Sequence, residues 1–98
     1  MLIAGSPIAF AYTNYTGPLT WIGTDWGGAG YLFALGGVTN QCPWNQFSLS
    51  SSAGGYKDQV ATLMLAWSLG ESVTVVTDAT DSCPNNRANI IAVQIPTR

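Results

Sequence analysis

Hydrophobic residues recur at helical spacing in residues 52–70. They occupy positions i, i+4, i+7, i+8 and i+11, which share one side of an α-helix and are not neighbours on a strand. Gly70 follows shortly after them, where a left-handed C-cap is expected. The pattern predicts one helix that packs over a small β-structure through Tyr56, Val60, Leu63, Met64 and Trp67.

The spacing changes to alternation directly after the helix. In residues 72–78, Val73, Val75 and Thr77 lie on one face, as in a half-buried strand. A last strand is expected in residues 90–95, with a core face that consists of Ile91, Val93 and Ile95.

Two strands joined by a hairpin are expected near the start of the chain. The pair Gly17-Pro18 signals a turn, and residues 19–24 alternate after it. Residues 25–28, with the sequence DWGG, close the hairpin. Residues 30–38 are apolar on both faces, which is typical of a central strand buried on both sides.

The pair Gly36-Gly37 indicates a bulge or a sharp bend, as strongly curved barrels require. A third strand is expected in residues 44–50, where Trp44 and Phe47 provide bulk.

The predicted order is three strands, one helix and two strands. This is the layout of a five-stranded Greek-key barrel of the OB type, with its helix between the third and fourth strands. The sequence therefore predicts a mainly β fold, with a single OB-like domain in residues 14–98 and an extended N-terminal arm in residues 1–13.

The arm, MLIAGSPIAFAYT, is almost wholly apolar. The triplet AFA before Tyr12 resembles a signal-peptide cleavage site, although no positively charged region precedes it. Pro7 disfavours a helix, so the segment is otherwise interpreted as a strand. That strand either adds to a neighbouring subunit or is the first strand of its own domain. For the first case, the candidate interface residues are Leu2, Ile3, Ile8, Phe10 and Tyr12.

The composition of the chain excludes some classes of binding partner. Only 8% of residues are charged and the net charge is -2, so the chain lacks the basic surface that nucleic acids and anionic membranes attract. The apolar arm is too short to span a bilayer as a helix. Association with other proteins, and with copies of itself, is favoured because a surface with few charges gives little electrostatic repulsion between molecules.

The two cysteines, Cys42 and Cys83, each precede a proline in a polar stretch. With no histidine and no second cysteine nearby, they favour a disulfide over a metal site; the alternative is two unpaired thiols in a cytosolic protein. A bridge would close about 40 residues and stabilise the fold by roughly 4 kcal/mol. It would also favour a secreted or cell-surface location.

Residues 41–95 resemble a known group of proteins. A cysteine-bearing strand is followed by an amphipathic helix that ends in LGESVTV (residues 69–75), an asparagine-rich loop and a hydrophobic last strand. This order resembles the B subunits of AB-type bacterial toxins, closest to those of subtilase cytotoxin and typhoid toxin. The resemblance implies an OB-fold, secretion, homo-oligomerisation and sugar binding. The chain departs from the group in its apolar arm and in lacking a recognisable sugar-site signature.

Catalysis is not expected, because the chain has no histidine to serve as a general base or zinc ligand. Asp78 and Asp81 form a close pair beside Asn85 and Asn86, but their spacing matches no calcium loop. Turn formation explains these residues better. We therefore predict no catalytic residues, no cofactor and no metal site.

Aromatic residues give the clearest candidates for ligand binding. Trp26, Trp44 and Tyr31 lie in or beside strands, where a ring can stack on a sugar, and Trp26 is expected to be exposed in its glycine-rich hairpin. Core packing is the favoured interpretation for Trp21, Trp44 and Trp67. Asn14 begins an N-glycosylation sequon, NYT.

Two functional hypotheses follow. The first is an extracellular structural subunit that self-assembles into a filament, with the N-terminal arm adding a strand to the neighbouring subunit. The alternative is a secreted, ring-forming, glycan-binding module similar to toxin B subunits.

Overall fold

The computed structural model describes residues 12–77, 83 and 86–96 of the chain. The predictions for residues 1–11, including the interface residues Leu2, Ile3, Ile8 and Phe10, lie outside this part, as do those for Asp78, Asp81 and Asn85.

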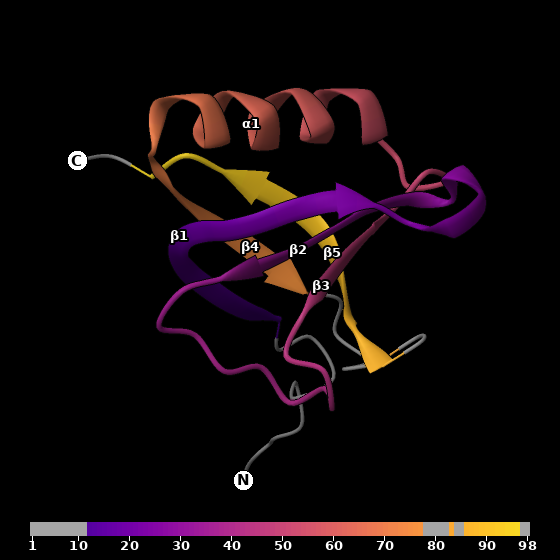
Figure 1. Ribbon diagram of the computed structural model, residues 1–98, viewed down its shortest axis with the longest axis horizontal. Helices are drawn as coiled ribbons and strands as arrows, with labels where there is room; N and C mark the ends of the chain where they lie inside the picture. Colours follow the sequence, from indigo (N-terminus) through magenta and orange to yellow (C-terminus); the bar gives the residue numbers. More distant parts are fainter. Residues whose placement is uncertain (1–11, 78–82, 84–85, 97–98) are drawn as a thin grey trace, which may run out of the picture.

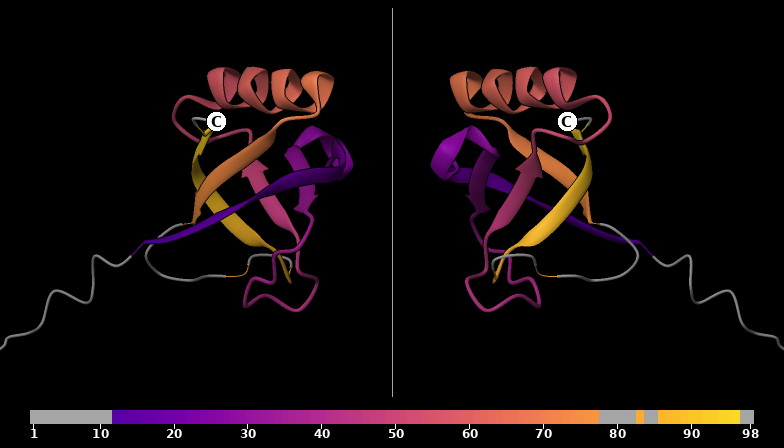
Figure 2. Two further views of the ribbon diagram at one scale, coloured as in Figure 1. Left: turned by 90° about the vertical axis from the view of Figure 1, so that its left-hand side faces the viewer. Right: turned by 90° about the vertical axis from the view of Figure 1, so that its right-hand side faces the viewer.

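The fold is mainly β, a closed five-stranded barrel of the OB type in the strand order β1-β2-β3-β5-β4. All neighbouring strands are antiparallel except β3 and β5, which are parallel. One helix lies between the third and fourth strands and covers one end of the barrel (Figures 1 and 2). The predicted fold class is therefore confirmed. The elements are β1 Thr13–Thr24, the short 3-10 turn η2 Trp26–Gly28, β2 Gly30–Leu35, β3 Phe47–Ser50, α1 Tyr56–Leu69, β4 Ser72–Thr77 and β5 Ala88–Gln94.

Strand β1 changes its partner midway. Residues 13–18 pair with β4, whereas the register with β2 begins at Leu19. The predicted turn at Gly17-Pro18 is therefore wrong, because both residues lie inside one continuous strand. Gly17 is required there, since a Cβ atom on it would lie 2.6 Å from the carbonyl oxygen of Gly36.

A bulge turns Trp21 out of the core. Leu19 pairs with Leu35 and Trp21 with Ala34, so Thr20 is an extra residue on β1. One extra residue reverses the faces of the residues that follow it. Leu19 and Ile22 pack against the core, while Trp21 is 36% exposed. The prediction that Trp21 packs in the core is wrong for this reason.

A second bulge reverses the faces of β5. Val76 pairs with Ala92 and Thr77 with Ile90, which leaves Ile91 as the extra residue. Ile90 is buried, whereas Ile91 is 43% exposed. The predicted core face was therefore wrong for Ile91, although Val93 and Ile95 do pack against the core.

Strand β3 is shorter than predicted. It begins at Phe47, which is fully buried, and Trp44 lies in the loop before it with 53% of its surface exposed. The expected core role of Trp44 is therefore wrong. Strand β2 ends at Leu35, before the predicted bend at Gly36-Gly37, where Gly37 has a φ of 73°.

Helix α1 contacts the barrel through Leu63 and Ala66, which are fully buried, with Tyr56 and Val60 packed at the margin. Trp67 is 47% exposed. The predicted buried face was wrong for Trp67, because Ala66 occupies the position against the barrel. The predicted C-cap is confirmed: Gly70 has a φ of 68°.

Candidate functional site

The seam between β3 and β5 has the shortest ladder of the barrel. Only two residue pairs join these parallel strands, Phe47 with Ala88 and Ser48 with Asn89. Beyond them, Leu49 and Ser50 on β3 and residues 90–94 on β5 have no ladder partner across the seam within the described part of the chain. Unpaired strand edges are templates for pairing with another chain.

A groove of about 530 Å³ lies where the two strands separate. Ser48 and Ser50 of β3 line one side, and Asn89, Ile90 and Ile91 of β5 line the other. The remaining lining residues are Asp25, Ala29, Ser52, Ala53 and Gly54. The groove thus joins small and polar side chains to an apolar wall and adjoins strand backbone with open pairing positions.

Gln59 of α1 bridges two of the lining residues. Its Nε2 atom donates hydrogen bonds to the carbonyl oxygens of Gly54, at 3.0 Å, and Ile91, at 3.3 Å. Its Oε1 atom is buried and has no hydrogen-bond partner within the described residues. The carbonyl of Ile91, the extra residue of the β5 bulge, therefore accepts a hydrogen bond from a side chain of α1.

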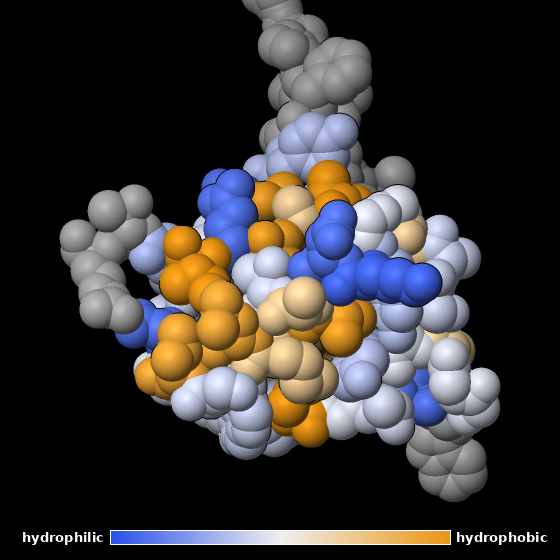
Figure 3. Space-filling view, turned by 90° about the horizontal axis from the view of Figure 1, so that it is seen from above, coloured by the Kyte–Doolittle hydropathy of each residue, from blue (hydrophilic) through white to orange (hydrophobic). Residues whose placement is uncertain are grey.

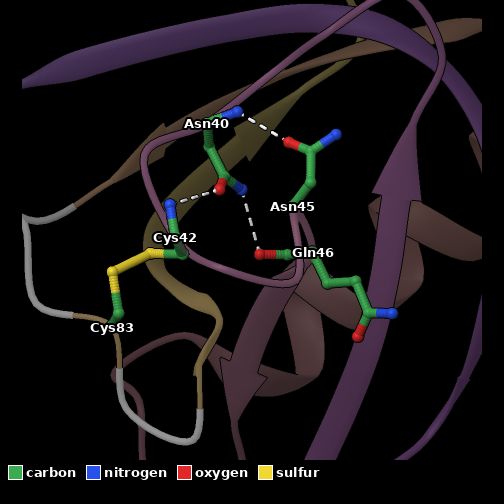
Figure 4. The surroundings of a disulfide bond; sticks show 5 residues. All are labelled: Asn40, Cys42, Asn45, Gln46 and Cys83. Carbon is green, nitrogen blue, oxygen red and sulfur yellow. Dashed lines mark hydrogen bonds between the residues drawn. A yellow bond between two sulfur atoms is a disulfide. The ribbon is translucent and has the colours of Figure 1, made fainter.

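A disulfide fastens the opposite, closed end of the seam. Cys42 and Cys83 are bonded with their Cα atoms 5.6 Å apart, as predicted from the sequence (Figure 4). Between the bridge and the ladder, the N–H of Trp44 donates to the carbonyl of Asn86 at 3.2 Å, and the N–H of Ala88 donates to that of Gln46 at 2.9 Å. The seam is thus held at one end and open at the other.

Two asparagines fold the loop that carries Cys42 (Figure 4). The buried Asn40 accepts from the N–H of Cys42 at 2.9 Å and donates from Nδ2 to the carbonyl of Gln46 at 3.0 Å. The N–H of Asn40 donates to Oδ1 of Asn45 at 2.7 Å. These bonds satisfy buried polar groups, which are costly when unpaired, and so fix the loop that leads into β3.

Trp44 forms an exposed platform at this closed end. The Cζ atom of Arg87 lies 4.5 Å from the centre of its ring, within the range of a cation–π interaction. Nε of Arg87 also donates to Oε1 of Gln46 at 2.7 Å. One face of the indole is therefore covered by a positively charged side chain.

The predicted aromatic ligand site is divided between two regions. Tyr31 lies on β2, paired with Leu49 near the open end of the seam, and its ring centre is 6.5 Å from that of Tyr56. Trp44 lies at the closed end. The backbone of Trp26 is in η2, but its side chain is outside the described part of the structure. The structure therefore does not bring Trp44 and Tyr31 together.

Two other predicted surface residues are exposed. Tyr12, the last of the candidate interface residues, is 54% exposed just before β1. Asn14 is exposed on β1, and the hydroxyl of Thr16 in its sequon is hydrogen-bonded to that of Thr74 at 2.7 Å. Glycosylation at Asn14 remains a prediction.

The groove and Gln59 were missed by the sequence reasoning. Ser48 and Ser50 have the alternation of any strand with one outward face, and Gln59 has the spacing of a polar residue beside the buried face of the helix. No local signal distinguishes a strand paired on both sides from one that separates from its neighbour, since pairing depends on the chain path between the strands.

A second feature is an apolar surface over α1 (Figure 3). Leu65 and Leu69 are 52% and 60% exposed, and Trp67 lies on the same half of the helix. Lys57 and Asp58 lie in its first turn. The outer side of α1 is therefore charged at its start and apolar towards its end.

In the part of the chain that the structure describes, no helix has the length and apolar character to cross a membrane. The same residues contain no cluster of three or more potential metal ligands. Comparisons with protein-family models, curated proteins and solved structures find no match to the chain.

Proposed function

We propose that this protein is an extracellular structural subunit that self-assembles into a filament, with the N-terminal arm of one copy adding a strand to the next. The observation that carries the proposal is the groove between β3 and β5, where the barrel offers unpaired strand edges. The arm is the donor and the groove is the acceptor. Strand addition of this kind takes its affinity from main-chain hydrogen bonds and its register from side-chain pockets.

The donor and the acceptor are separate features of one subunit. The arm precedes β1, whose first residue, Thr13, pairs with Thr77 of β4, whereas the groove lies between β3 and β5. A donor and an acceptor that are different surfaces of the same subunit make a head-to-tail contact, which forms open filaments unless the rotation closes a ring.

The arm is long enough to add a strand along the open edge of β5. Residues 90–94 of β5 extend over about 17 Å at the rise of a β-strand. Residues 1–11 can reach at most about 36 Å when extended. This is enough for a strand along that edge and a connection to the donor subunit.

An extracellular location is supported by the Cys42–Cys83 disulfide, since such bonds persist in oxidising compartments. The low charge of the chain, with 8% charged residues, weakens the repulsion between copies. Both properties suit a subunit that polymerises outside the cell.

Deletion of residues 1–11 tests the proposal. We expect fibres of the full chain by electron microscopy and a folded monomer of the shortened chain by size-exclusion chromatography. If the shortened chain still forms the same fibres, the arm is not the donor.

Crosslinking tests the acceptor. Ile8→Cys combined with Ser50→Cys in the groove should give a ladder of covalent oligomers with a short thiol crosslinker. Ile8→Cys combined with Ser68→Cys, on the exposed side of α1, is the matched control and should give none. Equal ladders in both would exclude the groove as the specific acceptor.

A second candidate is the ring-forming, glycan-binding module that the toxin resemblance implies. The exposed Trp44 beside Arg87 favours it, because indole rings stack on sugars. Electron microscopy would then reveal closed rings, and a glycan array should give signals that Trp44→Ala or Trp26→Ala removes. A wild-type protein that binds no glycan would exclude this candidate.

A further inference from the structure

We propose that the incoming strand pairs with β5 rather than β3, and that it displaces the side chain of Gln59 from the carbonyl of Ile91. This inference rests on the proposed function and deepens it. It identifies the acceptor edge, and it assigns to Gln59 the role of occupying that edge in the free subunit.

The open edge of β3 is short and its continuation is already bonded. Only Leu49 and Ser50 extend past the ladder with β5. The N–H of Ser51 then donates to the carbonyl of Ala29 at 2.9 Å, and that of Ala53 donates to the carbonyl of Ser50 at 3.0 Å. The chain turns from there towards α1, which leaves little backbone for a new partner.

The open edge of β5 is longer. Residues 90–94 continue past the ladder with β3, while their other side pairs with β4. The extra residue Ile91 lies within this stretch and lines the groove. Bulges bend a strand and redirect its groups, and here the carbonyl of Ile91 is directed to Gln59.

Gln59 is an imperfect substitute for a strand. Its bond to Ile91 is 3.3 Å long, slightly longer than is usual for N–H donors, and its Oε1 atom is buried without a partner in the described residues. A backbone N–H from an added strand would donate to the carbonyl of Ile91 in place of Gln59, with the geometry of a β-ladder. The amide of Gln59 would then be free to bond other groups. Side chains that cover an edge are a known protection against unwanted pairing.

Hydrogen–deuterium exchange of the full chain, compared between its dilute and assembled forms, tests which edge is used. We expect the peptide that contains residues 88–96 to exchange more slowly in assemblies, and the peptide that contains residues 47–53 to change little. If Ile8→Cys and Ser50→Cys crosslink while only the β3 peptide slows, the choice of β5 is wrong but the proposed function stands. If neither peptide slows and no crosslink forms, both are wrong.

Gln59→Met tests the role of the side chain. Methionine keeps the length and helix propensity of glutamine but cannot donate to Ile91. We expect the concentration for half-assembly to fall about three- to ten-fold, as the loss of one competing hydrogen bond implies. Gln41→Met makes the same change at an exposed position remote from the groove and should have no such effect.

Far-UV circular dichroism of both variants establishes that they fold, and Gln59→Ala provides a second variant if Gln59→Met does not. Folded Gln59 variants that assemble no more readily than Gln41→Met would overturn the role given to Gln59.

Discussion

Cys42 and Cys83 occupy equivalent places on the two strands of the seam. Each lies five residues before the first residue of its strand, Phe47 on β3 and Ala88 on β5, and the two Cα atoms are 5.6 Å apart. The disulfide therefore brings the parallel strands together at one end. The ladder between the strands has only two pairs. The strands are therefore held together at the end near the disulfide and separate beyond the second pair.

Replacement of both cysteines by alanine should lower the free energy of unfolding by roughly 4 kcal/mol, because the bridge closes a loop of 41 residues. Urea denaturation of the variant and of the oxidised wild type measures the difference. Wild-type protein in reducing agent is the control, and its free energy of unfolding should be close to that of the variant. A variant as stable as the oxidised protein would show that the seam does not depend on the bridge.

Trp44 and Phe47 should differ sharply in their contribution to stability, although the sequence predicts both as core residues of one strand. Trp44→Ala removes an exposed ring and its contact with Arg87, so we expect a loss of about 0.5–1 kcal/mol. Phe47→Ala empties a fully buried position and should cost about 3–5 kcal/mol. Urea midpoints of the two variants test the order, and similar losses would contradict the burial of these side chains.

The order of the elements could be predicted from the sequence, but the two bulges could not. Alternation and helical spacing predicted the order of the elements, because each depends on neighbouring residues. Thr20 and Ile91 could not be recognised as bulges, since an extra residue is defined only against the partner strand. Each bulge reverses a face, which is why Trp21 and Ile91 were predicted on the wrong side.

The candidate site was predictable only in part. The disulfide follows from two isolated cysteines in a chain without histidine. The separation of β3 from β5, and the approach of Gln59 to Ile91, depend on contacts between residues distant in the sequence. They therefore required the structure.

Substitution by alanine should destabilise the protein at Gly30 but not at Gly54. Gly30 has a φ of 144°, and a Cβ atom on it would collide with the carbonyl oxygen of Leu49. Gly54 has no atom within 4 Å of the position of a Cβ. We expect Gly30→Ala to lose at least about 1–3 kcal/mol of stability from backbone strain, and Gly54→Ala to change it by less than about 0.5 kcal/mol.

Thermal denaturation of the two glycine variants provides the measurement. Since Gly54 lines the groove and Gly30 follows the lining residue Ala29, the Gly54 variant also controls for general effects of alanine in this region. A Gly30→Ala protein as stable as the wild type would contradict the close approach of β2 and β3 at this point.

Copies of the protein could also associate through the apolar side of α1. A variant of that surface distinguishes this contact from strand donation by the arm. Leu65 and Leu69 are 52% and 60% exposed, so Leu65→Gln with Leu69→Gln should leave stability within about 1 kcal/mol of the wild type. If the arm and the groove join the subunits, fibres of this variant should form at the same concentration as those of the wild type in light scattering and electron microscopy. Deletion of residues 1–11 is the complementary variant and should abolish the fibres while the leucines remain. The opposite pair of results would mean that copies associate through the helix, and that the groove is open for another reason.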